Sequence, residues 1–96
     1  MRVQGFAHKG LKRLYEEDNA KGVPAQSADK LRKMLEFLEA MNDEHELDML
    51  PTWKAHKLTG DRSGRWSLSV TGNLRLTFQI DSVETEICDV NLENYH

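Results

Sequence analysis

The sequence predicts an α+β fold in which two N-terminal helices pack on one face of a small antiparallel β-sheet. The first half of the 96-residue chain carries apolar side chains at helical spacing, whereas the second half alternates apolar and polar residues. A turn containing glycine and asparagine separates two of the alternating stretches, as is typical of a β-hairpin. Helices followed by an antiparallel meander indicate two packed layers, and the length suits one domain over residues 1–96.

The first half of the chain accounts for the helices. Residues 3–6 are expected to form a short first strand, and residues 8–17 form a helix with Leu11 and Leu14 on one side. The sequence Gly22-Val23-Pro24 interrupts that pattern, and proline suits the first turn of a new helix. The second helix begins near residues 25–27, with apolar residues at helical spacing: Leu31, Met34, Leu35, Leu38 and Met41. Residues 43–49 form one further short helical turn.

The second half of the chain accounts for the sheet. Residues 55–58 form a short strand, and a polar turn follows at residues 59–64. Period-two alternation predicts strands at residues 66–70 and 74–80, joined by the turn at residues 71–73. After a turn at residues 81–82, residues 83–90 make the last strand. One face of this sheet is buried by the helices, and the other is free for a functional site.

Composition restricts the location of the protein. No apolar run reaches the length of a membrane span, and the N-terminus lacks the apolar stretch of a signal peptide. A single cysteine, Cys88, excludes an internal disulfide and a cysteine-based zinc site. Its apolar strand context predicts a buried thiol. We therefore expect a cytoplasmic protein that has no contact with a membrane.

Charge is unevenly distributed along the chain. The net charge is −3, which argues against general nucleic-acid binding because phosphate contacts require cations. Residues 53–80, however, contain one acid, Asp61, and five cations: Lys54, Lys57, Arg62, Arg65 and Arg75. Residues 43–48 contain four acids and no cation. A basic centre within an acidic frame can bind an anionic substrate while limiting unspecific binding.

The free face of the predicted sheet collects side chains suited to phosphodiester cleavage. Arg75 lies opposite the apolar side of its strand, Arg65 begins the neighbouring strand, and His56 lies on the strand before it. The chain ends in Tyr95 and His96. Histidine can move a proton near neutral pH, arginine can bind phosphate oxygens, and an aromatic ring can stack on an unpaired base. The face carries little carboxylate.

Each of these residues also has a simpler interpretation. His56 could be a hydrogen-bonded structural histidine, His96 a functionless chain end, and Arg75 a surface cation paired with an acid. His8 and His45 are interpreted as ordinary solvated residues, and Trp53 and Trp66 as packing residues. No ligand spacing typical of a metal site is present, so neither a metal nor another cofactor is expected.

Several runs of the chain together carry a resemblance to a known family. They extend in order through nearly the whole sequence, with few length changes: residues 6–14, 22–26, 28–31, 51–64, 66–70, 72–73, 75–78 and 93–96. Residues 51–64, which include Leu58-Thr59-Gly60-Asp61-Arg62, are the most characteristic of these. The chain resembles the HigB toxins, the plasmid-maintenance killer proteins of the RelE superfamily. The resemblance implies the RelE-like fold of microbial ribonucleases.

That resemblance also implies an activity and partners. HigB toxins cleave messenger RNA in the ribosome's decoding site by attack of a 2′-hydroxyl, without a metal. A HigA-type antitoxin with a helix-turn-helix neutralises them, and the pair represses its own operon, so operator DNA is bound only through the antitoxin. Carried over by position, the resemblance implies that His56 and His96 share proton transfer, that Arg75 stabilises the phosphorane, and that Tyr95 packs on or orients the nucleotide. The residues expected to bind substrate are Lys57, Arg62, Arg65 and Asn94.

The sequence departs from the family pattern at three positions. Thr59 stands where a lysine is common, Asn94 replaces an acid, and Arg65 replaces an aromatic residue. Losing a positioned acid–base group costs about 10²–10⁴ in rate, so the departures at Thr59 and Asn94 predict weakened activity, whereas Arg65 adds a cation. They also leave a second function open, in which a catalytically weak or inactive toxin fold only binds its antitoxin and co-represses the operon. A third, cleavage of free RNA, fits less well because no groove of cations is evident.

Overall fold

A five-stranded sheet forms the centre of the computed structural model, which describes residues 1–62 and 64–94. The strand order is β1-β5-β4-β3-β2, and every neighbouring pair is antiparallel except β1 and β5, which are parallel. The strands are β1 (Arg2–Val3), β2 (His56–Lys57), β3 (Arg65–Ser69), β4 (Leu74–Asp81) and β5 (Glu86–Asn94). The long strands β4 and β5 lie at the centre, so the sheet is built around their pairing.

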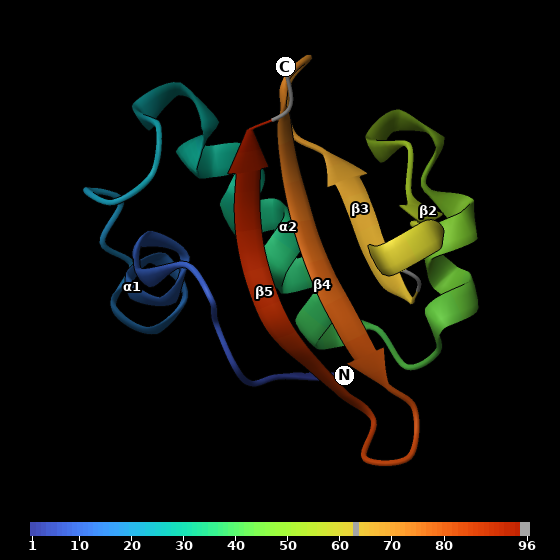
Figure 1. Ribbon diagram of the computed structural model, residues 1–96. Helices are drawn as coiled ribbons and strands as arrows, with labels where there is room; N and C mark the ends of the chain where they lie inside the picture. The colour runs from blue at the N-terminus through green and yellow to red at the C-terminus, as the bar shows by residue number, and fades with distance from the viewer. Residues whose placement is uncertain (63, 95–96) are drawn as a thin grey trace.

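Two α-helices, α1 (Lys9–Glu17) and α2 (Ala28–Ala40), form a second layer on one side of this sheet. The described residues also contain four short 3₁₀ segments, η1 (Ala25–Ser27), η2 (Glu44–Met49), η3 (Pro51–Trp53) and η4 (Gly60–Arg62). Figure 1 shows α2 behind β4 and β5, with α1 beside it. The predicted α+β fold, with its two helices on one face of the sheet, is confirmed. None of the helices in the described ranges is long and apolar enough to cross a bilayer.

The core lies between α2 and the inner face of the sheet. Leu31, Met34 and Leu38 of α2 are fully buried, as are Leu68 and Phe78 of the sheet. The helical spacing of the first set and the period-two alternation of the second had predicted these positions. Of the two tryptophans, Trp66 is buried in this core and Trp53 packs edge-on against Phe37, as expected.

Helix α1 is capped at its N-terminus by a histidine, His8. The Nδ1 atom of His8 accepts a hydrogen bond from the Leu11 N–H at 3.1 Å, which satisfies one of the free donors of the first turn. The side chain is half-buried, and this burial lowers the pKa of His8. The expectation that His8 is an ordinary solvated residue was therefore wrong. His45, in contrast, is exposed and contacts Asp43.

Several strand boundaries differ from those expected. The last strand begins at Glu86 rather than at residue 83, because the Asp81 carboxylate accepts the N–H groups of Val83 and Glu84, both at 3.1 Å. Thr85 then takes a left-handed conformation with φ 54° before the strand starts. At the N-terminus the strand covers only Arg2–Val3, since Gly5 adopts φ 113°. The strand expected at residues 55–58 is reduced to β2.

A bulge interrupts β5 in its middle. Thr77 pairs with Asn91 while Gln79 pairs with Cys88, so β5 holds one more residue than β4 between these pairs. Asp89 occupies the irregularity with φ 52°. Next to it the N-terminal segment docks, with the Val90 N–H donating to the Gly5 carbonyl at 3.0 Å. Cys88, expected to be buried, is half-buried.

Candidate active site on the outer sheet face

One row of side chains crosses four strands on the face away from α2. His56 pairs with Ser67, Ser67 with Thr77, and Thr77 with Asn91. Because residues directly opposite one another share a face, these four side chains stand on the same side of the sheet. Neighbouring strands are about 4.8 Å apart, which puts the Cα atoms of His56 and Thr77 roughly 10 Å apart.

Two further rows flank this one. Arg65 pairs with Gln79 on one side, and Ser69, Arg75 and Glu93 form the row on the other. Each flanking row lies two residues along the strands, a step of about 7 Å. The structure thus brings His56, Arg65 and Arg75 onto the face where the sequence placed them. A face of this size can contact more than one phosphate of an extended strand.

His56 is held with one ring nitrogen available. The side chain is exposed, and its Nδ1 lies 3.1 Å from the backbone carbonyl of Lys54. A carbonyl can only accept, so Nδ1 carries the proton of this hydrogen bond. In the neutral ring Nε2 is consequently the unprotonated nitrogen, which is the form that a general base requires.

Arg62, Arg65, Thr77 and Glu93 form a connected polar network, called here the arginine–glutamate network. Arg65 Nη2 donates to Thr77 Oγ1 at 3.0 Å and to the Asp89 carbonyl at 2.9 Å. The Thr77 hydroxyl in turn donates to the Glu93 carboxylate, which also accepts from Arg62 Nη2. The hydrogen bond from Arg62, together with that from Thr77, lowers the pKa of Glu93 despite its partial burial. Glu93 is therefore ionised at neutral pH.

Arg75 is oriented by the hairpin that follows β3. Its Nη1 donates to the Thr71 carbonyl at 2.8 Å, to the Gly72 carbonyl at 3.2 Å and to Ser69 Oγ at 3.3 Å. These bonds hold the half-buried guanidinium against the turn at one end of the face. A guanidinium carries five N–H donors in a fixed plane, so bonds from one nitrogen also fix the direction of the others.

Two of the expected substrate-binding residues do not join this face. Lys57 pairs with Trp66, its Nζ lies 5.7 Å from the centre of the Trp66 ring, and it contacts Glu44 at 3.5 Å. Its charge is thus on the side of the sheet that faces the helices. Asn94 pairs with Leu74 and is exposed at the end of β5, also out of register with the Glu93 row. Tyr95 and His96 lie outside the described residues.

Three side chains on this face were not among the expected site residues, although the alternation of their strands had put Thr77 and Ser67 on it. Thr77 and Ser67 are fully buried, and Glu93 brings a carboxylate onto a face expected to carry little. Glu93 was not expected there because the last strand was expected to end at residue 90, whereas β5 extends to Asn94. Extending the last strand toward residue 94 would not by itself have placed Glu93 on this face. The bulge at Asp89 must also be included, because it determines which of the later residues face outward.

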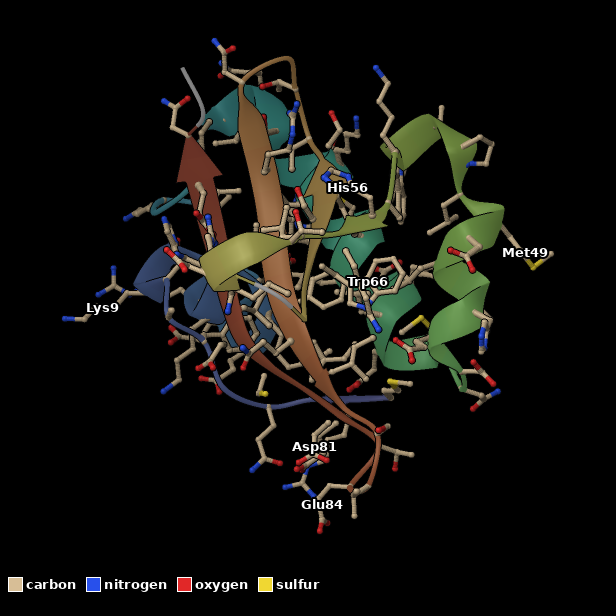
Figure 2. The ribbon with its side chains drawn as sticks, turned by 45° about the vertical axis from the view of Figure 1, so that its right-hand side comes forward. Lys9, Met49, His56, Trp66, Asp81 and Glu84 are labelled. Atoms are coloured by element: carbon tan, nitrogen blue, oxygen red, sulfur yellow. The ribbon has the colours of Figure 1, made fainter. Side chains whose placement is uncertain are left out.

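The η4 turn covers part of this face. The ion pair between Arg62, at the end of η4, and Glu93, on β5, spans β4 above Thr77. Figure 2 shows the turn, in yellow, in front of β4, with His56 to one side. Two buried polar atoms in this region have no hydrogen-bond partner among the described residues, Arg65 Nε and Ser67 Oγ. The face expected to be free is thus open at His56 and covered in its middle.

The chain is similar in sequence to a known family and in fold to several solved structures. The sequence model of the family described as RelE-like toxin of type II toxin-antitoxin system HigB matches residues 4–96. The chain is 39% identical to the endoribonuclease HigB of Proteus vulgaris, over 98% of this chain and 99% of that protein. Two solved structures share the fold at low identity. The YoeB dimer of Staphylococcus aureus has a TM-score of 0.61, 17% identity and coverage of 100% of this chain and 97% of that one. The YoeB/ParE toxin of Agrobacterium tumefaciens has a TM-score of 0.59 and 16% identity, with coverage of 100% of this chain and 99% of that one.

Proposed function

The chain belongs to the HigB family of RelE-like toxins from type II toxin–antitoxin systems, and from this premise we propose that it is an endoribonuclease that cleaves messenger RNA on the ribosome. The observation that carries the proposal is the near-complete match to a protein named as an endoribonuclease, 39% identical over 94 residues. The outer sheet face supports it, because a histidine with an available Nε2 lies among arginines there.

The reaction is an attack of a ribose 2′-hydroxyl on the adjacent phosphorus. Nε2 of His56 accepts the proton of the 2′-hydroxyl as the new P–O bond forms. The bond to the 5′-oxygen breaks, and that oxygen takes a proton from His96, leaving a cyclic phosphate and a free 5′-hydroxyl. No metal or other cofactor takes part in these steps. Both proton transfers are assigned to histidines, the residue type most often used as a general acid or base.

Arginines stabilise the charge that develops on the phosphate. Arg75, oriented by the carbonyls of Thr71 and Gly72, donates to the oxygens of the pentavalent phosphorane. Arg62 and Arg65 bind the strand beside it, where the arginine–glutamate network already gathers two guanidinium groups. Tyr95 stacks on the nucleotide base. With few cations available beyond these, the ribosome holds the messenger in position.

The partner of the toxin is an antitoxin of the HigA type. The family is described as toxins of type II toxin–antitoxin systems, which supports an antitoxin as the binding partner of this chain. The antitoxin carries the helix-turn-helix, so the pair binds operator DNA through it. The site of action is the translating ribosome, which places the toxin in the cytoplasm.

Expression of the chain without an antitoxin tests the proposal. We expect growth arrest and new 5′ ends within translated reading frames, because cleavage occurs on the ribosome. The variants His56→Ala and His96→Ala each lose about 10²–10⁴ in cleavage rate and no longer arrest growth. The matched control is His45→Ala, which removes an exposed histidine of η2 and leaves cleavage unchanged. Intact messenger RNA in cells that contain abundant, folded protein would contradict the proposal and favour a toxin fold that only binds its antitoxin.

A further inference from the structure

Two buried polar atoms of β3 lie on the outer face without a hydrogen-bond partner among the described residues. Ser67 Oγ and Arg65 Nε are buried and make no hydrogen bond to any described residue. Both belong to β3 and to the outer face, two residues apart. A buried polar group without a partner costs about 1–3 kcal/mol, so a native structure that keeps two of them together requires a reason.

The chemistry of these atoms selects an anion. Nε of arginine is only a donor, and a serine hydroxyl donates readily to an oxygen that carries negative charge. The Nη2 atom of the same guanidinium donates to two neutral groups, Thr77 Oγ1 and the Asp89 carbonyl. The nearby carboxylate, Glu93, accepts from Arg62 and from Thr77 instead. Arg65 therefore keeps a buried N–H that no described protein group accepts, and its charge has no direct hydrogen bond to a described carboxylate.

The η4 segment (Gly60–Arg62) lies in front of β4 on this face (Figure 2). Gly60, its first residue, has φ 72°, and a Cβ added there would meet no atom within 4 Å. The backbone of η4 is thus not packed against other parts of the chain at this position. The ion pair between Arg62 and Glu93 ties it to β5. A ligand that takes Arg62 from Glu93 loosens this tie and uncovers the face below.

We infer that Arg65 Nε and Ser67 Oγ form a phosphate-binding subsite and that the Arg62–Glu93 ion pair is its cover. An RNA phosphate replaces Glu93 as the partner of Arg62, and its second anionic oxygen accepts hydrogen bonds from Arg65 and Ser67. Glu93 occupies the position of the substrate's charge until RNA arrives. Ser67 is directly opposite His56 in the strand register, so a phosphate in this subsite lies beside the proposed base. The RNA source of the phosphate rests on the proposed function; the subsite itself does not.

Titration of the purified full chain with inorganic phosphate, at constant ionic strength, tests the subsite. Nuclear magnetic resonance follows the Nε–Hε signal of Arg65, which we expect to shift on phosphate binding. Ser67→Ala weakens binding by at least about fivefold, because a hydrogen bond to a charged group is lost. Glu93→Gln strengthens it by at least about threefold, since the competing charge is removed. Ser82→Ala, in the exposed β4–β5 turn, is the control and leaves the affinity unchanged.

Two further measurements separate the possible outcomes. Without phosphate, Ser67→Ala melts at or above the temperature of the original chain, because removal of a buried hydroxyl without a partner costs nothing. A lower melting temperature, or an Arg65 signal that phosphate does not move, would overturn the subsite.

A short RNA with 2′-deoxy substitutions, which cannot be cleaved, competes with phosphate if the source is RNA. Failure to compete limits the site to free phosphate and overturns the RNA assignment. Phosphate binding without cleavage in cells rejects the proposed function alone, whereas cleavage by a Ser67→Ala chain at the original rate rejects the subsite alone.

Discussion

Replacing Gly10 with alanine is expected to destabilise the protein, although alanine is the better helix former. Helix α1 passes directly over the backbone of Gly22. A Cβ added to Gly10 would lie 2.1 Å from the Gly22 carbonyl oxygen and 2.5 Å from its carbonyl carbon. The atoms in conflict belong to the main chain, so no side-chain rotation can relieve the contact.

Two opposing effects determine the size of the change. Helix propensity favours alanine over glycine by about 1 kcal/mol. Against this, the helix and the Gly22 loop must separate by roughly 1 Å to restore an ordinary contact, which loosens the packing of Leu11 and Leu14, both buried next to Gly10. Overpacking of this kind costs about 1–3 kcal/mol and more where backbone must move. We expect a net loss of about 1–2 kcal/mol in the free energy of unfolding.

Urea and thermal unfolding of the purified chain, followed by circular dichroism, measure this loss. For a domain of this size, each kcal/mol shifts the melting temperature by about 4–8 °C, so a drop of roughly 5–15 °C is expected. Gly72→Ala is the control, because a Cβ added there would meet no atom within 4 Å, and its effect stays within about 0.5 kcal/mol. If Gly10→Ala unfolds at the same or a higher urea concentration than the original chain, the close approach of α1 and Gly22 is not the constraint argued here.

Two other changes test the helix cap and the network. Burial lowers the pKa of His8 in the folded chain. As the pH falls below about 6.5, the histidine of the unfolded chain is therefore protonated first. The free energy of unfolding decreases over this range until the pH passes the folded-state pKa. His8→Ser keeps a capping oxygen that does not titrate. On going from pH 7.5 to pH 5, the variant should therefore gain stability relative to the original chain. If urea unfolding gives the same difference between the two chains at both pH values, this reasoning is contradicted. Thr77→Val removes the hydroxyl between Arg65 and Glu93 and costs about 1–3 kcal/mol of stability, whereas Thr77→Ser keeps it and costs less; equal urea midpoints for the two variants would show that the hydroxyl is not needed.

The elements that sequence reasoning placed well are those in which one period persists over several residues. Trp66, Leu68 and Val70 alternate with serines, and β4 alternates in the same way, so only one register buries both apolar sets. The position of Arg75 on the outer face follows directly from that alternation. His56 is placed by the same logic, since β2 pairs with β3 and inherits its register.

The wrong predictions for the start of the last strand and for His8 both concern residues whose structure depends on a local hydrogen bond. Val83 has strong β propensity and suggested an early start for the last strand, yet 89% of its surface is exposed. The Asp81 carboxylate binds the N–H groups that a strand would have used, and the chain remains in a turn to Thr85. His8 was misjudged for the same reason, because its role depends on a hydrogen bond to Leu11 rather than on a pattern.

The charge balance of the candidate site depends on a single backbone irregularity that no pattern in the sequence signals. Without the bulge at Asp89, β5 would keep strict alternation from Cys88, and Leu92 would face outward while Glu93 faced the core. With it, Leu92 pairs with Leu76 in the core and Glu93 reaches Arg62. The same irregularity provides the Asp89 carbonyl that holds Arg65. Family resemblance can therefore assign His56 and Arg75 by position, but the balance between two arginines and one carboxylate beside them follows from the conformation of Asp89.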